Sequence, residues 1–414
     1  MSEHVENTLD CMGDEPQSYR FIELASYILF GIGPLVGNAV LTLLGPIAAQ
    51  FLVDPTAILV AIPAFMFPFA FIQLFSGAIS DIYGRVPVIT GGLAAFIAGI
   101  ALIAFSTTIE VFALGNLVSG VGFGFTNPVL LALLSDCSTQ DEIPKKMGIA
   151  SALASFGVGL GPFIAGQMVV LGWQYYYLLI LSIVFIGLVA VAVAKRPPTK
   201  VHDETGIGVL IRNLSLELRR PIVLLLAIAG FLVSNAYLGT LIWTSRGLTG
   251  AIDETLTGLL LLGAGIFGAI AGLLLNRMIR RFGYGISIAI GIVSLFATLA
   301  VFILVGDITT ASSIPWVGLA LILVGWAGGT LFPLLITVSQ IISPERRGVL
   351  AGVLTFAYFL GMALIPILYE PLFRFGMTAL YLGLLGVLVL LLIFFSALRR
   401  KVENLLAWAG DQDS

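Results

Sequence analysis

The residues whose types and spacing could do chemistry form one compact set. Gly77, Asp81, Gly84 and Arg85 lie close together between two long apolar stretches. The glycines allow two helix ends to approach closely and to turn tightly. Arg85 can pair with Asp136, an acid that follows a later apolar stretch. This set predicts a charged helix junction rather than a catalytic centre, and a short solvated loop is the alternative.

The chain has few cysteine and histidine residues that could act in catalysis or bind a metal. The chain holds two cysteines, Cys11 and Cys137, and two histidines, His4 and His202. Their spacing forms neither a metal-ligand set nor a disulfide framework, and the long apolar stretches contain no histidine. We therefore expect no metal, no cofactor and no enzymatic activity.

The composition indicates a membrane protein. Of the 414 residues 59% are apolar, or about 244, close to the ~240 that twelve spanning helices of ~20 residues need. Charged residues make up 10% of the chain, whereas soluble domains carry about 25%. The net charge of −3 gives no basic surface for nucleic acid. A water-soluble enzyme and a nucleic-acid partner are thereby excluded.

Membrane-spanning helices must therefore position the charged groups. Eleven stretches of 22 residues or more lack Asp, Glu, Lys and Arg, and each can span a bilayer. One of them is long and has Gly172 and Trp173 near its centre, which predicts two helices joined by a tight turn. Another begins with a polar segment from Thr309 to Ser313, which predicts a loop. The expected fold is all-α with twelve transmembrane helices. The stretches are 24–53, 55–80, 86–109, 111–135, 147–194, 221–245, 255–276, 282–306, 308–344, 348–369 and 375–398.

The basic residues predict the orientation. An even number of helices puts both termini on one side, and Lys and Arg concentrate on the cytoplasmic side. With cytoplasmic termini, only Arg246 and Arg374 of the 20 basic residues lie outside. We therefore expect a multi-pass protein of the plasma or inner membrane, and we expect Arg246 to be a solvated loop residue.

A hydrophilic segment divides the helices six and six. Its portion from Ile207 to Leu218 suits a short helix on the cytoplasmic membrane surface, and an unstructured connector is the alternative. The expected organisation is a cytoplasmic tail, 1–20; a six-helix bundle, 21–194; a cytoplasmic linker, 195–220; a second six-helix bundle, 221–398; and a cytoplasmic tail, 399–414.

The two bundles are related by an internal repeat. An offset of 204 residues superposes four glycines or prolines of the first half on the same residue types in the second. Two six-helix halves of the same sense imply a pseudo-two-fold axis along the membrane normal, with a substrate site between the halves. The pairs are Gly148 and Gly352, Gly157 and Gly361, Pro162 and Pro366, and Gly172 and Gly376.

Two motifs resemble those of the major facilitator superfamily. Residues 77–85 match its G-x-x-x-D-x-x-G-R loop between helices 2 and 3. On helix 5, Gly157, Gly161, Pro162 and Gly166 match the G-x-x-x-G-P-x-x-G-G motif of the drug and proton antiporters, with Ala165 for one glycine.

The resemblance implies a twelve-helix transporter with alternating access. It gives Asp81 the role of an acid that closes the cytoplasmic side between the halves, and Glu345 to Arg347 form a second expected gate element. Small residues on helix 5 form a narrow ridge for close helix packing, Pro162 permits a bend, and the motif favours antiport.

Polar and aromatic residues on the expected cavity helices are candidates for substrate contacts, because lipid would penalise many of them. About half could instead form hydrogen bonds between helices. No fixed charge lies near mid-membrane, which favours apolar or amphipathic substrates over small anions. The main candidates are Asn38, Asn116, Asn127, Asn235, Tyr237, Trp326 and Tyr358, and we expect Asn38, Asn235 and Trp326 at one level.

Proton coupling has weaker support, since every acid lies at or beyond a helix end. Glu23, at the inner start of helix 1, is the candidate proton site, although pairing with Arg20 is the stronger interpretation. The expected function is proton-coupled efflux of apolar or amphipathic small molecules by a monomer surrounded by lipid. The alternatives are a facilitator or importer of an uncharged metabolite, and a receptor or sensor that does not transport.

Overall fold

The computed structural model describes residues 19–139, 142–194, 207–342 and 347–412. Over these residues the chain is helical, and the one β-type contact is an isolated bridge between Thr249 and Ile252. The expected all-α class is thereby confirmed. The expected N-terminal tail and the gate residues Glu345 and Arg346 fall mostly or wholly outside the described residues.

The helices follow the apolar stretches because a helix satisfies its own backbone hydrogen bonds in lipid. The first half contains α2 (Arg20–Phe51), α3 (Pro55–Ile58), α4 (Ala61–Tyr83), α5 (Arg85–Ala104), α6 (Ile109–Asp136), α7 (Ile143–Met168), the 3-10 turn η3 (Val169–Leu171) and α8 (Trp173–Val193). After α9 (Ile207–Leu218), the second half contains α10 (Pro221–Leu248), α11 (Glu254–Val305), α12 (Ile314–Ile342), α13 (Arg347–Phe373) and α14 (Met377–Gln412).

Twelve membrane crossings result from eleven helices of membrane length among the described residues. α11 has 52 residues, which at 1.5 Å per residue would extend for about 78 Å, far more than a ~30 Å bilayer core. It is two helices joined at Gly283, whose φ of 76° interrupts the helical geometry. Gly172, with a φ of 116°, separates η3 from α8 in the same way. Glycine adopts such angles without steric cost, so the expected turn at Gly172 is confirmed.

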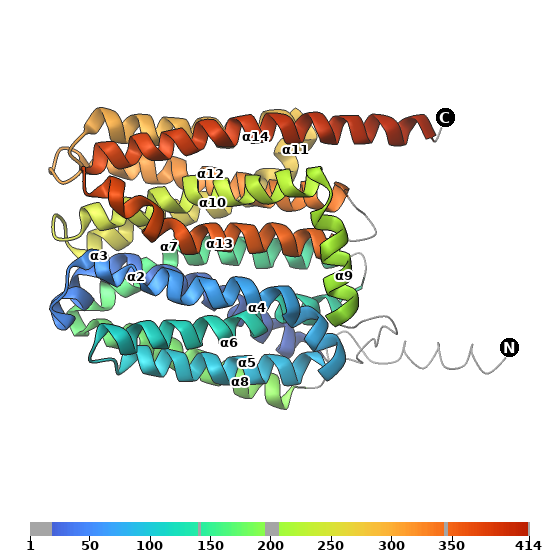
Figure 1. Cartoon of the computed structure of the whole chain (residues 1–414). Helices are drawn as coiled ribbons and strands as arrows, with labels where there is room; N and C mark the ends of the chain where they lie inside the picture. The colour runs from blue at the N-terminus through green and yellow to red at the C-terminus, as the bar shows by residue number, and fades with distance from the viewer. Residues whose placement is uncertain (1–18, 140–141, 195–206, 343–346, 413–414) are drawn as a thin grey trace.

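The long helices lie side by side, and α9 crosses one end of the bundle (Figure 1). α14 ends on the same side of the molecule as α9. We call this the α9 end and the other the opposite end. α9 itself agrees with the predicted helix rather than with an unstructured connector, and α12 begins at Ile314, directly after the expected polar loop.

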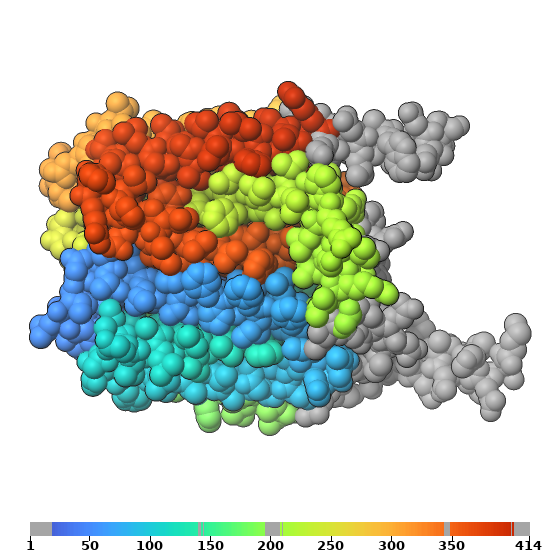
Figure 2. Space-filling model, in the orientation of Figure 1, coloured from blue at the N-terminus to red at the C-terminus, as the bar shows by residue number. Residues whose placement is uncertain are grey.

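The halves meet along two long seams and one crossing. α7 packs against α11, α4 packs against α13, and α2 contacts α10. Figure 2 shows the first half and the second half as adjoining layers, with α9 running over both at one end. These six helices therefore form the described boundary between the two halves.

Candidate functional site

Arg85 gathers the charged groups at the α9 end of the first half. Its Nη1 lies 2.6 Å from Asp81 Oδ1 and 2.5 Å from Ser80 Oγ, and its Nε lies 3.1 Å from Asp136 Oδ2. The expected pairing of Arg85 with Asp136 is therefore present. We call Ser80, Asp81, Arg85 and Asp136 the junction cluster, since it ties α4, α5 and α6 together.

The two glycines of this motif differ in role. Gly84 has a φ of 90° between α4 and α5, an angle that disfavours other residues. A Cβ added at Gly77 would meet nothing within 4 Å. The close approach predicted at Gly77 is therefore not seen in this structure, because a side chain there would have open space.

Asp81 lies about level with the start of α13 in the second half. A Cβ at Gly352 of α13 would lie 3.8 Å from Leu74 of α4. Asp81 is seven residues beyond Leu74, and α13 begins five residues before Gly352. These spans are about 10 and 8 Å, so Asp81 and the first turn of α13 lie at about the same level along the bundle.

The glycine motif of α7 packs against two helices rather than one. A Cβ at Gly157 would lie 3.1 Å from the carbonyl oxygen of Gly31, and one at Gly161 only 2.2 Å from that of Leu35, both on α2. A Cβ at Gly166 would instead lie 2.3 Å from the carbonyl oxygen of Glu254 on α11. The motif thus holds α7 within its own half and against the other half.

The seam between α7 and α11 is a contact between backbones. A Cβ at Gly159 would lie 2.8 Å from the Cα of Gly265, and one at Gly258 would lie 2.8 Å from the carbonyl oxygen of Pro162. Sequence reasoning missed Gly159, although it lies between two motif glycines. Only residues without side chains permit this separation.

Arg246 joins the halves at the opposite end. Its Nη2 lies 3.1 Å from Asp54 Oδ1 and its Nε donates to Thr56 Oγ1 at 2.9 Å. Its guanidinium lies 5.2 Å from the centre of the Phe373 ring, within cation–π range. The side chain is 14% exposed. The expectation of a solvated loop residue is wrong, because α10 continues past Arg246 and carries it against the first half.

We call Asp54, Thr56 and Arg246 the opposite-end latch. Among the ion pairs between described residues, the Asp54–Arg246 pair is the one that links the two halves. Hydrogen bonds from Thr56 and then the charge of Arg246 hold the pKa of Asp54 below its ordinary value. Its carboxylate is 66% exposed, so the pair resembles a rim contact of modest strength.

Glu23 pairs with Lys146, which also lies 3.6 Å from Glu142. Among the described residues it forms no ion pair with Arg20, so that expectation is wrong. α7 begins beside α2 at the α9 end and brings in Lys146, a partner that is distant in sequence. The carboxylate of Glu23 therefore has its counter-charge on another helix of the same half.

Three of the candidate cavity amides bond to their own helices. Asn38, Asn116 and Asn235 each donate to the carbonyl oxygen four residues earlier, at 2.9 Å. The Oδ1 atoms of Asn38 and Asn235 are buried and accept no hydrogen bond from a described residue. Asn127 is half-buried. These two carbonyl oxygens are therefore among the buried acceptors of α2 and α10 that have no hydrogen-bond partner among the described residues.

The expected common level of Asn38, Asn235 and Trp326 stays a prediction, but the neighbours of Asn235 and Tyr237 are defined. A Cβ at Gly361 of α13 would lie 3.0 Å from Asn235 Nδ2, so this amide faces α13. The ring of Tyr237 lies against Gly328 of α12. Trp326 precedes Gly328 by two residues, about 200° around the helix, and therefore lies on a different side of α12 from Tyr237.

Tyr358 belongs to an aromatic chain that crosses between the halves. Its ring centre lies 4.0 Å from that of Phe332 and 5.4 Å from that of Phe359. Phe359 in turn lies 4.8 Å from Phe69 of α4, edge to face. Sequence reasoning missed Phe69, Phe332 and Phe359, although the alternating phenylalanines from 65 to 71 are visible in the sequence.

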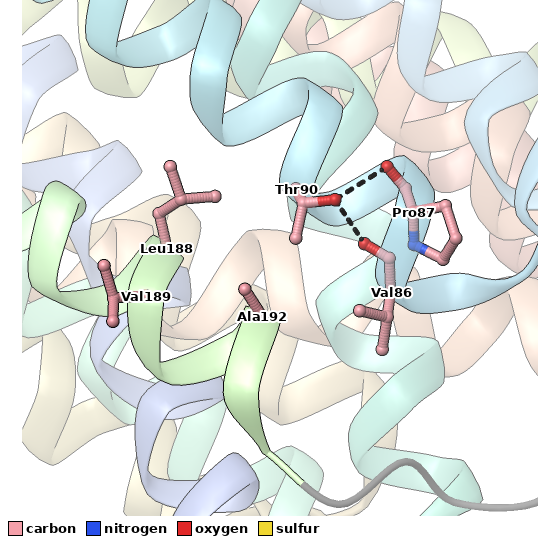
Figure 3. A pocket seen from close by; sticks show the side chains of 6 residues that line it. All are labelled: Val86, Pro87, Thr90, Leu188, Val189 and Ala192. Carbon is pink, nitrogen blue, oxygen red and sulfur yellow. Dashed lines mark hydrogen bonds between the residues drawn. The ribbon is translucent and has the colours of Figure 1, made fainter.

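A surface hollow of about 580 Å³ lies elsewhere, between α5 and α8 of the first half (Figure 3). Thr90, its one polar side chain, already donates to the carbonyl oxygens of Val86 and Pro87. None of the candidate cavity residues lines it. Its apolar wall suits an acyl chain of the bilayer better than a recognised solute. The other lining residues are Val86, Pro87, Leu188, Val189 and Ala192.

Comparison with known proteins supports a transporter. An MFS-type transporter of Bacillus subtilis (strain 168), YceJ, is 25% identical over 338 residues, which are 79% of this chain and 84% of that protein. The methylenomycin A resistance protein of the same strain is 31% identical over 158 residues, 37% of this chain and 34% of that protein.

The fold agrees with a solved transporter and with a family model. The crystal structure of the nucleoside transporter NupG matches with a TM-score of 0.74 at 15% identity, covering 91% of this chain and 98% of that one. At this identity the match shows the fold alone. The model of the Major Facilitator Superfamily matches residues 26–366. The chain therefore belongs to the major facilitator superfamily of membrane transporters.

Proposed function

We propose that this chain is a secondary active transporter that works by alternating access and is closed at the opposite end in this structure. The observation that carries the proposal is the opposite-end latch, which ties α10 to the segment after α2 across the two halves. The junction cluster at the α9 end lies wholly within the first half. Breaking the opposite-end latch while the halves close at the α9 end would change the side of the membrane from which the substrate site is reached.

The α9 end is cytoplasmic in this proposal, and both termini lie on that side. The support is the distribution of basic residues, of which only Arg246 and Arg374 belong to the other side. Asp81 then acts at the cytoplasmic boundary, where its position level with the first turn of α13 would let it draw the halves together.

The proposed cargo is apolar or amphipathic, and the proposed direction is efflux coupled to protons. Neutral amides and aromatic rings occur along α2, α10, α12 and α13, and the free carbonyl oxygens of Asn38 and Asn235 can orient a donor. The partial match to a drug-resistance protein favours efflux. Glu23 remains the proposed proton site, with Lys146 competing for its carboxylate.

A substrate screen in proteoliposomes, with and without a pH gradient, tests this proposal. Antiport requires that substrate movement acidify the side the substrate leaves, and a rate that ignores the gradient at every pH would replace antiport by facilitation. Asp81→Asn should slow transport more than it weakens substrate binding, because it loosens a gate. Normal turnover in that variant would exclude the gate role of Asp81.

A further inference from the structure

α9 is fixed to the bundle on one side and open to its surroundings on the other. It packs against α4 of the first half and against α10 and α13 of the second. On the packed side Glu217 is 2% exposed and pairs with Arg220 at 2.8 Å. Figure 2 shows the helix at the surface, running over both halves.

The open side carries two parallel stripes. Ile211 and Leu218 are 52% and 38% exposed. Arg212 is exposed directly after Ile211, and Arg219 is exposed in the turn that follows the end of α9 at Leu218. Residues seven apart lie within ~20° of each other and about 10 Å apart along a helix. The apolar stripe therefore flanks the packed side, and the basic stripe points away from the protein.

Neither arginine of this stripe forms an ion pair with a described residue. α9 also lies at the end of a bundle of membrane-length helices, the level at which lipid headgroups are found. An apolar stripe beside a basic one is the pattern of helices that lie in an anionic membrane surface. Anionic headgroups would supply the partner that these two cations lack among the described residues.

We propose that α9 binds anionic phospholipid headgroups through Arg212 and Arg219 while Ile211 and Leu218 insert among the acyl chains. The guanidinium groups suit phosphate because they donate in a planar fork. α9 contacts both halves and crosses the seam between α4 and α13. Lipid bound to α9 therefore helps to hold this helix across the seam. The lipid is distinct from any transported substrate, and its binding does not depend on the direction of transport.

Lipid quenching in nanodiscs tests this inference on the whole chain. A bimane label is attached to Ser215→Cys, between the two stripes, after Cys11→Ser and Cys137→Ser. Discs of phosphatidylcholine and phosphatidylglycerol receive a trace of one or the other lipid carrying a spin label near its headgroup. Stronger quenching by the spin-labelled phosphatidylglycerol is expected, and the preference should fall as salt is added.

Charge variants distinguish a specific site from general attraction. Arg212→Gln with Arg219→Gln should weaken the preference by about fivefold for each arginine removed. Arg212→Lys with Arg219→Lys should keep most of it, and Arg374→Gln, which removes an exposed arginine far from α9, should leave it unchanged. Equal quenching by both lipids in the parent, or an unchanged preference in the double glutamine variant, overturns the proposal. Either result leaves the transport proposal standing, since no substrate is involved.

Discussion

The hydroxyl of Ser245 on α10 donates a hydrogen bond to the backbone carbonyl of Leu41 on α2, and the two residues are 204 positions apart. This separation equals the repeat offset, so each residue is the repeat equivalent of the other. A residue that touches its own equivalent lies on the pseudo-two-fold axis. The same holds one turn further, where a Cβ at Gly45 would lie 3.3 Å from Thr249 Cγ2.

This crossing gives the halves a common contact on the axis near the opposite end. The two seams that the axis relates differ in character: glycine backbones meet between α7 and α11, whereas the rings of Phe69 and Phe359 meet between α4 and α13. Backbone contacts have little room to slide, and ring contacts can rearrange by side-chain rotation. We therefore expect opening movements to change the α4–α13 seam more than the α7–α11 seam.

Loss of the opposite-end latch should favour opening at that end. Arg246→Gln removes a charge pair whose acid is exposed, a contact worth up to about 1 kcal/mol, or about fivefold in population. Spin labels at Leu52→Cys and Ala251→Cys would report the distance across this end. A larger share of long distances is expected. Arg374→Gln, whose partner Glu370 is in its own helix, is the matched control and should leave the distances unchanged.

Acid should open the latch only at low pH. The pKa of Asp54 lies below its ordinary value of 3.8 in the latched form, so the latch is present above that value and is lost as the pH falls through the lowered pKa. The same spin labels should give constant distances from neutral pH down to about pH 5. A transition near pH ~6 would contradict this assignment and would point to another titrating group.

Alanine should lower the stability of the protein at one glycine of α7 but not at another. Gly161→Ala puts a Cβ 2.2 Å from the carbonyl oxygen of Leu35 and should lower the thermal midpoint, with a cost of about 1–3 kcal/mol for overpacking. Gly148→Ala meets nothing within 4 Å and should be neutral or stabilising by up to ~1 kcal/mol, because alanine favours the helix. Scanning fluorimetry in detergent measures both, and equal shifts would show that the α2–α7 contact is looser than described.

Cys137 should react slowly with thiol reagents. Burial raises the pKa of its thiol to about 12 from 9.0, and the carboxylate of Glu23 adds to the shift. Because the thiolate is the nucleophile, maleimide labelling below pH ~9 should be about a thousandfold slower than at an ordinary thiol. Thr107→Cys in a Cys11→Ser background provides an exposed control in the same protein. Comparable rates at the two sites would contradict the burial of Cys137.

The sequence by itself determined the membrane class, the twelve crossings and the repeat. Bilayer thickness dictates the length of each apolar stretch. A turn such as that at Gly172 can be predicted from the local sequence because glycine adopts a positive φ without steric cost. The pairing of Arg85 with Asp136 was also predictable, since Arg85 begins α5 and Asp136 ends α6 at the same boundary of the first half.

The tertiary structure alone decided which side of each helix faces which neighbour. In a membrane protein both lipid and core are apolar, so hydropathy does not record the rotation of a helix about its axis. For this reason the sequence did not indicate that Asn235 faces α13, and Arg246 was expected in water but joins the halves. Glu23 likewise met Lys146, because contacts between residues far apart in the chain depend on helix packing that no local pattern encodes.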